Sequence, residues 1–417
     1  MKINQEITGT IFKRLAITLG ILLFIRLGTF LPVPGINHSD LALYIQSHSV
    51  TRSLVSTFAG NDTFVIGLFT LNIFPYINAS ILLQLILGFS PQLSKLQKEG
   101  DLEGRRTLNR LTRFITLVWS IIQSVSLTIY LKQILFDWNY TLALEIVIWL
   151  TTGSMIILWL SELITDYGLG NGASLLIYTN IISSLPNLTK AIVLENSKNV
   201  PLVSEIGIVL LLFAALYGIV FLQEGLRIIP LISSKQLNQS DPLTLTSNYY
   251  LPLRFNQAGV MPIILTTAIL VVPNYASNIG LFPKLDFLTN LESLSIFYWI
   301  GYFLLILLFS SFYSTIVLNP KDISDQLQKM SVTIPGIRPG IQTTFYLKQV
   351  MKRTTLVGAT MLATLATIPN FIESTLSITN LNGLSSTSLL ILAGVVLDLV
   401  REVKNIYFSN VYKNMYQ

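Results

Sequence analysis

The chain has 417 residues, of which 52% are hydrophobic and only 12% are charged, and its net charge is +6. Soluble domains carry roughly 25% charged residues, so this composition excludes an ordinary soluble protein and indicates a polytopic membrane protein. Cysteine is absent, which excludes disulfides, thiol catalysis and cysteine-bound metals.

Apolar windows of about 18–20 residues are long enough to cross a bilayer, and the sequence contains ten of them. In chain order they lie at 15–33, 70–90, 114–131, 142–161, 171–187, 202–222, 257–273, 296–318, 355–372 and 384–400. The windows at 171–187 and 257–273 are weaker. The first window follows Lys13 and Arg14 but has no small-residue cleavage site after it, so we expect no cleavable signal peptide.

Basic residues fix the expected orientation of these spans. With the N-terminus on the cytosolic or stromal side, the inside segments hold 21 of the 27 Lys and Arg residues. The outside loops hold only Arg52, Lys132, Lys190, Lys198 and Lys284. Inside loops of membrane proteins are enriched in Lys and Arg, so both termini are predicted to lie inside.

The second span is interrupted and polar. The segment 58–62, FAGND, breaks the hydrophobic run, and polar or helix-breaking residues follow at Asn72, Pro75, Asn78, Ser80 and Gln84. Irregular backbone at membrane depth is tolerated only beside protein or a water-filled cavity. The interruption therefore indicates a lined path through the membrane.

The ten spans divide into two halves of five, 1–187 and 188–417, joined by the outside loop 188–201. The broken second span and the short seventh span hold corresponding positions in the halves, which indicates a path at the repeat interface. Three inside loops, at 91–113, 223–255 and 319–354, are basic and longer than orientation requires. We interpret them as a docking surface for an acidic or RNA-containing partner, with topology anchoring as the alternative.

The sequence carries no pattern typical of catalysis. His38 and His48 lie in an outside loop without metal-ligand spacing, and no Gly-Lys pair exists to form a P-loop. We interpret Asp322 and Asp325 as helix-start residues. The segment GLGNG at 168–172 follows no strand and predicts a turn that enters a helix.

An ion-coupled transporter of a small solute is the alternative function. Such carriers usually need an ionisable group near the membrane midplane. The spans offer only Arg26, deep in the first, and Glu145, near the outer end of the fourth. The absence of midplane acids makes this the weaker hypothesis.

Six collinear motifs resemble the SecY family of protein-translocation channels. They are FIRLGTFLPVPGIN (24–37), NIFPYINASILLQLI (72–86), GLGNGASLLI (168–177), LPLRFNQAGVMPIIL (251–265), IPGIRPG (334–340) and TSLLI (387–391). The resemblance implies an all-α polytopic membrane protein. In that fold, ten transmembrane helices form two pseudo-symmetric five-helix halves around a central hourglass pore with a short plug half-helix. It implies a channel rather than an enzyme, without cofactor or metal.

The resemblance also assigns roles to residues. The pore ring, an aliphatic seal at the waist, maps to Ile77, Ile81, Ile177, Ile181, Ile264 and Ile391. The plug maps to 53–67 and includes Phe58, Ala59, Gly60 and Asn61. The lateral gate toward lipid maps to Asn78, Gln84, Asn256, Thr266 and Thr267. Asn72 and the pair Ser385 and Ser386 stand where the family usually has glycine, and Asn tolerates a positive φ best after glycine.

The family implies partners outside the chain. These are the clamp subunit SecE, a SecG-like subunit, the SecA motor or the ribosome, signal-bearing preproteins and membrane lipid. No specific nucleic-acid binding is expected apart from contact with ribosomal RNA. Arg338 is the first candidate for partner docking, followed by Arg227 and Arg254. The segment GRRTLNRLTRFITLVWSIIQS (104–124) resembles cyanobacterial and plastid members. We therefore expect a multi-pass protein of the plastid thylakoid membrane, with a bacterial inner membrane as alternative.

Overall fold

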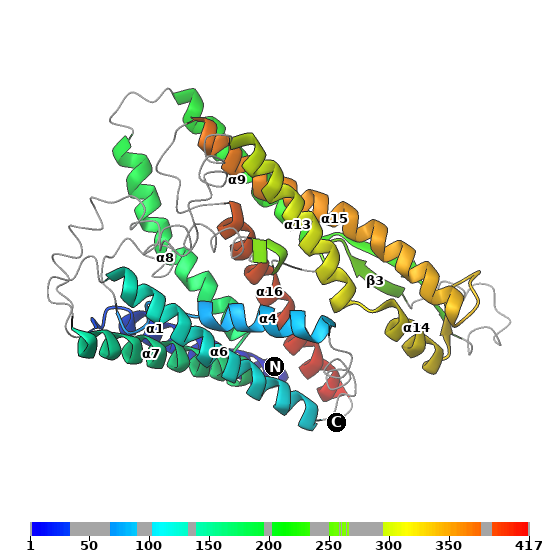
Figure 1. Cartoon of the computed structure of the whole chain (residues 1–417). Coiled ribbons are helices and arrows are strands. Elements are labelled where there is room, and N and C mark those ends of the chain that lie inside the picture. The colour runs from blue at the N-terminus through cyan, green and yellow to red at the C-terminus, as the bar shows by residue number, and fades with distance from the viewer. Residues whose placement is uncertain are drawn as a thin grey trace. The chain divides into compact units, whose positions relative to one another are not determined.

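The computed structural model describes residues 2–33, 67–89, 102–131, 139–195, 202–233, 250–257, 259, 261–263, 265–266, 295–376 and 386–415 (Figure 1). The chain forms two compact units. Unit 1 comprises Met1–Glu195 and Val395–Gln417, and unit 2 comprises Asn196–Gly394. The predicted division into pseudo-symmetric halves at 187 and 188 stays a prediction, because these units do not test internal symmetry.

Unit 1 is helical. It contains α1 (Lys2–Gly28), α4 (Phe74–Phe89), α6 (Leu102–Leu131), α7 (Tyr140–Tyr167), α8 (Gly172–Glu195) and the end of α16 (Ser386–Met415). Each predicted span of this unit falls on one of these helices. The basic start of α6, ahead of the predicted span at 114, continues the same helix.

A row of hydroxyl side chains lines the buried face of α6. Thr116, Ser120, Ser124 and Thr128 are four residues apart and at most 2% exposed. Each donates its hydroxyl hydrogen to a carbonyl one turn earlier in α6, over 2.7–2.9 Å. Small side chains with satisfied hydroxyls let α4 and α7 pack closely on α6 without an unpaired polar group in the membrane interior.

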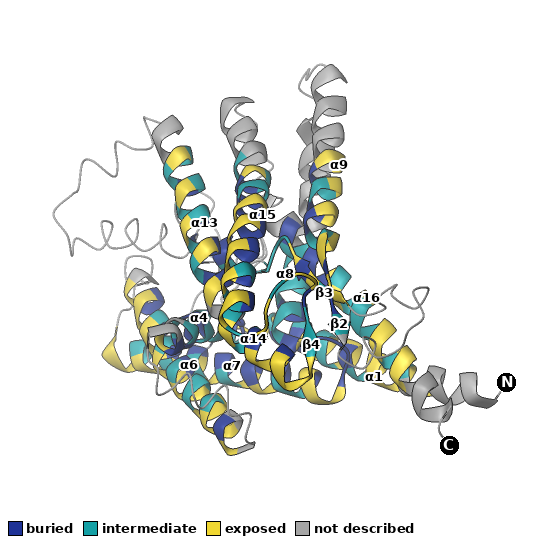
Figure 2. Cartoon of the chain, turned by 90° about the vertical axis from the view of Figure 1, so that its right-hand side faces the viewer, coloured by how far each residue is buried: buried dark blue, intermediate teal, exposed yellow. Residues whose placement is uncertain are grey.

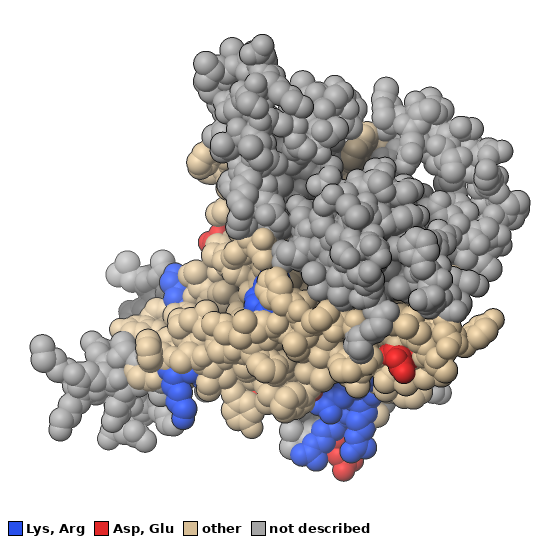
Figure 3. Space-filling model, turned by 90° about the vertical axis from the view of Figure 1, so that its left-hand side faces the viewer, with Lys and Arg blue, Asp and Glu red and all other residues tan. Residues whose placement is uncertain are grey.

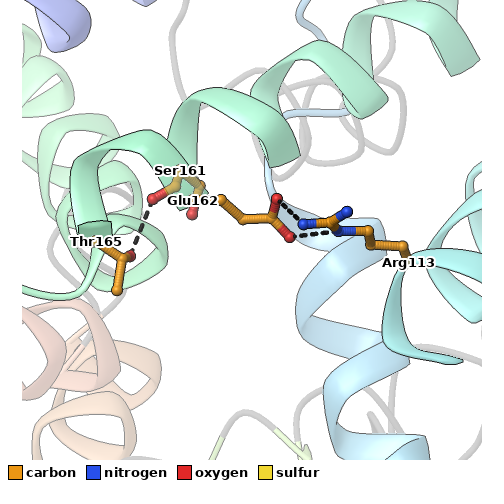
Figure 4. Close-up of polar contacts among 4 residues, drawn as sticks. All are labelled: Arg113, Ser161, Glu162 and Thr165. Carbon is orange, nitrogen blue, oxygen red and sulfur yellow. Dashed lines mark hydrogen bonds and ion pairs between the residues drawn. The ribbon is translucent and has the colours of Figure 1, made fainter. Parts of the chain in front are cut away.

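An ion pair joins α6 to α7 (Figure 4). Arg113 donates from Nε and Nη2 to the two carboxylate oxygens of Glu162, both over 2.8 Å. The pair is partly exposed, so its contribution to stability is at most about 1 kcal/mol despite the bidentate geometry. It links the N-terminal half of α6 to the C-terminal end of α7.

The GLGNG segment forms the predicted turn between α7 and α8. Gly168 closes α7 by donating its N–H to Ile164 O over 2.8 Å, and Asn171 Oδ1 accepts the Ala173 N–H at the start of α8. Thr165, which is bonded within α7 in Figure 4, also accepts the Gly172 N–H over 3.0 Å. The glycine-rich segment is therefore a turn that connects two helices and not a phosphate-binding loop.

Unit 2 contains three long helices, α9 (Leu202–Glu224), α13 (Ser295–Val317) and α15 (Ile341–Leu376), which run side by side (Figure 1). Buried and exposed residues mix along the described parts of these helices in Figure 2. Their shared core includes Ile219, Leu222, Ile306, Leu362 and Leu390, the last from α16. Of the predicted span 257–273, only 257, 259, 261–263 and 265–266 are described, and 261–263 and 265–266 are helical.

The segments of unit 2 that were predicted as inside loops fold into a second small core. Strand β1 (Leu226–Pro230) pairs antiparallel with β3 (Tyr250–Arg254), and β2 (Ile232–Ser233) pairs with β4 (Val332–Thr333). Ile229, Leu253, Leu327 and Leu347 are among the buried residues that join these strands to α14 (Pro320–Lys329) and α15. Full burial of each aliphatic side chain contributes roughly 1.5–3 kcal/mol, which holds these segments in a defined shape.

Helix α14 has a clear start signal. Asn319 Oδ1 accepts the Lys321 N–H over 3.1 Å, Pro320 holds the first helical position and Asp322 lies in the first turn. The prediction for Asp322 is confirmed. The prediction for Asp325 is wrong, because Asp325 lies in the middle of α14 and is exposed.

Three helical stretches among the described residues are long and apolar enough to cross a membrane: Arg106–Ile129, Tyr140–Tyr167 and Trp299–Lys329, the last of which runs from α13 into α14. Gly172–Ser183 and Phe213–Glu224 are shorter apolar helices. Along α1, Leu19, Leu23 and Leu27 lie on one face and are 57–63% exposed. Most described side chains on the face in Figure 3 are uncharged. Apolar surface of this extent needs a cover such as lipid hydrocarbon.

Candidate functional site

The predicted plug ends at Gly67, and this residue is firmly attached to the rest of unit 1. Gly67 forms an isolated β-bridge with Pro32, and the Leu68 N–H donates to Leu31 O over 2.9 Å. A Cβ at Gly67 would overlap Thr29 O, and one at Gly153 of α7 would overlap Leu68 O. The turn from 67 to 73 is therefore clamped between the end of α1 and α7. Phe58, Ala59, Gly60 and Asn61 lie outside the described residues.

Asn72 ends this turn with a left-handed backbone. Its φ is 48°, its exposure is 4%, and its Oδ1 accepts the Ile73 N–H over 2.8 Å. Few residues other than glycine adopt this conformation, and Asn does so because its short side chain bonds the local backbone. The positive φ expected at Asn72 is therefore confirmed.

Replacement of Asn72 by Val should destabilise the protein by roughly 1–2 kcal/mol, because a β-branched residue is strained at this φ and removes the acceptor for Ile73 N–H. Asn72→Gly should be nearly neutral. Thermal unfolding of the purified variants in detergent measures both effects. Equal unfolding temperatures for the Val and Gly variants would contradict this account of the turn.

The predicted ring residues of unit 1 lie on two helices. Ile77 and Ile81 of α4 are 5% and 3% exposed, whereas Ile177 and Ile181 of α8 are partly buried. In each pair the residues are four apart and share one helix face. Ile391, on α16, is partly buried, and Ile264 lies outside the described residues. Their convergence on one pore stays a prediction.

The predicted gate residues differ in what their side chains do. Asn78 is partly buried in α4, and Gln84 Nε2 lies 3.5 Å from Ser80 Oγ on the same helix. Asn256 is partly buried ahead of the seventh span. Thr266 is fully buried and donates to Pro262 O over 2.7 Å, so its hydroxyl is satisfied within its own helix. Thr267 lies outside the described residues.

A polar cluster that sequence reasoning missed holds the start of the seventh span. Ser314 Oγ of α13 donates to Gln257 Oε1 over 2.8 Å and lies 2.7 Å from Thr355 Oγ1 of α15. A Cβ at Gly358 of α15 would overlap Phe255 O, so the backbone before Gln257 lies directly on α15. Ser314 and Thr355 are hydroxyl residues within otherwise apolar helices, and this is the sequence feature that could have indicated the cluster. The cluster attaches the N-terminal end of this predicted span to α13 and α15.

The three predicted docking arginines are exposed but differ in setting. Arg227 pairs across the β1–β3 ribbon with Leu253, and Arg254 pairs with Leu226. Because neighbouring strand positions project to opposite faces, these two arginines point to opposite sides of the ribbon. Arg338 lies in a turn between Gly336 and Gly340, whose φ values are 78° and 102°. Within the described residues its guanidinium makes no hydrogen bond or ion pair.

Hydroxyl groups bonded to backbone carbonyls hold the shape of that turn. Thr343 Oγ1 donates to Arg338 O over 2.9 Å, and Ser324 Oγ donates to Gly340 O over 3.0 Å. None of these bonds uses the Arg338 side chain, so the turn keeps its shape without it. Among the described residues, no cluster of three or more His, Cys, Asp or Glu side chains could hold a metal.

Comparison with known proteins identifies the family. The SecY family model matches residues 67–400. A protein translocase subunit SecY of Trieres chinensis is 62% identical over 416 residues, which cover 98% of each chain. The subunit of Porphyra purpurea is 43% identical, covering 97% of this chain and 98% of that one, and the subunit of Synechococcus elongatus is 39% identical, covering 96% and 93%.

Solved structures share the fold. A SecY structure concerned with the plug domain has a TM-score of 0.69 at 16% identity and covers 97% of this chain and 94% of its own. Sec61 in a canine ribosome-channel complex has a TM-score of 0.60 at 15% identity, with the same coverage. The ten-helix channel fold implied by the motifs is therefore confirmed. The chain belongs to the SecY family.

Proposed function

We propose that this chain is the central pore-forming subunit of a preprotein translocation channel. It moves unfolded polypeptides across the membrane and releases transmembrane segments sideways into lipid between the second and seventh spans. The observation that carries the proposal is full-length similarity, at 62% identity, to a relative named as a protein translocase subunit. The family is one of channels and not of enzymes.

The pore chemistry follows from the side chains available. The six ring isoleucines form a compliant apolar constriction that binds no ions and closes by dewetting. The gate carries amides and hydroxyls because charged groups would cost too much to expose to lipid. The Gln257 cluster supports this scheme, since it ties the inside end of the seventh span to α13 and α15. Movement of the gate then has to occur nearer the membrane centre.

The chain carries no motif for a motor, so partners supply the energy. Structural neighbours come from ribosome-channel complexes, which supports a ribosome at the inside face. SecA serves as the motor for completed preproteins, SecE clamps the halves together, and a SecG-like subunit is optional. Arg338 is the main contact for the ribosome and SecA. Arg227 and Arg254 add contacts on either side of the β1–β3 ribbon.

The relatives also bear on location. A diatom, a red alga and cyanobacteria contribute the similar SecY proteins, which supports a plastid. We place the chain in the thylakoid membrane with both termini on the stromal side. The distribution of Lys and Arg among the loops supports this orientation, because inside loops are enriched in these residues.

Reconstitution tests the proposal against the small-solute carrier. Proteoliposomes containing the chain with SecE should protect a signal-bearing preprotein from external protease when SecA and ATP are added. They should show no solute uptake driven by a proton or sodium gradient. Gradient-driven uptake without preprotein protection would overturn the proposal in favour of the carrier.

A further inference from the structure

Arg26 is a charged side chain within the first membrane span, and its main contact is a backbone atom. Its Nη2 donates to the carbonyl oxygen of Thr179 in α8 over 2.5 Å. The two residues are 153 positions apart, so the bond links α1 to α8 directly. Ionisable residues inside membrane spans are costly and usually mark functional sites.

The bond lies at the level of the proposed seal. Thr179 stands two residues after Ile177 and two before Ile181, so its carbonyl belongs to the helical turn that carries both ring residues of α8. The Thr179 hydroxyl is occupied elsewhere, since it donates to Leu176 O over 2.9 Å. Arg26 therefore contacts the backbone of this turn and needs no particular side chain at 179.

The contact does not neutralise the guanidinium. The acceptor is a carbonyl and not a carboxylate, and the second nitrogen, Nη1, is buried without a hydrogen-bond partner among the described residues. Among the described residues this half-buried charge has no counter-charge, which is costly, and an apolar side chain of similar length would often be at least as stable. Stability alone therefore does not explain an arginine at this position.

We propose that Arg26 is a positioning residue for the pore ring: its bond to Thr179 O holds the α8 turn with Ile177 and Ile181 at the distance from α1 that keeps the channel sealed. The inference rests on the proposed channel function. Without the bond, the α8 turn shifts, the constriction admits water, and the resting channel conducts ions while the chain still folds.

A substitution series separates the hydrogen bond from the bulk of the side chain. Arg26→Met keeps the length but donates nothing, Arg26→Gln offers a shorter neutral donor, and Arg26→Lys keeps a charged donor. Thr179→Ala is the matched control, because it leaves the carbonyl oxygen in place. The measurement is the resting ion conductance of planar bilayers that contain the variant complex with SecE.

The Met variant should raise resting conductance about tenfold, the size expected for the loss of one charge-assisted bond. Gln should give an intermediate rise, and Lys and Thr179→Ala should remain close to wild type. Wild-type resting conductance in a Met or Gln variant that accumulates normally would overturn the inference. Failure of both variants to accumulate would also overturn it, since Arg26 would then be a folding residue.

The same preparations distinguish this inference from the channel function. If wild-type complex translocates preprotein and the Met variant stays sealed, only the role of Arg26 is wrong. If wild-type complex translocates nothing, the proposed function itself fails.

Discussion

Replacement of Ile77 or Ile391 by Asn should open the resting channel to ions and relax its requirement for a functional signal sequence. Asn brings a polar amide into an apolar constriction, which then fills with water. We expect resting conductance at least about tenfold above wild type, since an unsatisfied buried polar group favours the wet state by roughly 1–3 kcal/mol. Planar-bilayer conductance and export of a preprotein with a defective signal measure the two effects.

Matched controls decide whether such an effect belongs to the ring. Ile77→Val and Ile391→Val keep the aliphatic surface and should leave the seal intact. Ile146→Asn places the same amide in the fully buried core of α7, away from the predicted ring. It should lower the amount of folded protein without producing an open channel. If the Asn variants at 77 and 391 conduct no more than wild type, these residues are ordinary core.

Reversal of charge at Arg338 should abolish motor-driven translocation and leave folding unchanged. The guanidinium is exposed, and the bonds that shape its turn come from the Arg338 carbonyl, Thr343, Ser324 and Gly340. Arg can bind a partner carboxylate or phosphate through two hydrogen bonds, whereas Lys offers a point charge. A like-charge contact costs several kcal/mol, so Arg338→Glu should lower SecA-dependent translocation roughly a hundredfold.

The comparison is between export rate and steady-state protein level in the same membranes. Arg338→Lys should give an intermediate defect. Lys404→Glu makes the same charge change at an exposed position of α16, outside the three basic loops, and should have little effect. Joint loss of export and protein level would make Arg338 structural, and loss of neither would remove it from the docking surface.

Hydropathy and short motifs predicted much of the fold. Spans were predictable because a bilayer demands long apolar runs, and the start of α14 was predictable because Asn319, Pro320 and Asp322 are local signals. Asp325 was misassigned because an acid in the middle of a helix has the same local sequence character as one at its start. The positive φ of Asn72 was predictable because the preference for this backbone conformation is a property of the single residue.

Features that depend on distant partners escaped prediction. Strand β2 pairs with β4 about a hundred residues later, and each has only two residues, too few for a periodic pattern. The Arg26 bond was hidden because its acceptor is a main-chain carbonyl, which every residue possesses. The role of Gln257 was not predicted, whereas its neighbour Asn256 was assigned to the gate. Nothing in the sequence tells which of the two amides forms a hydrogen bond with Ser314.

Cross-linking of a stalled preprotein tests the central claim most directly. The chain has no cysteine, so a single introduced cysteine is the only thiol on the channel. A preprotein halted midway and carrying one cysteine should form a disulfide with Cys introduced at Ile77, Ile181 or Ile391. It should form none with Cys at Leu23, which is 62% exposed on the apolar face of α1. Equal cross-linking at Leu23 and at the ring positions, or none at the ring, would contradict passage of the polypeptide through this pore.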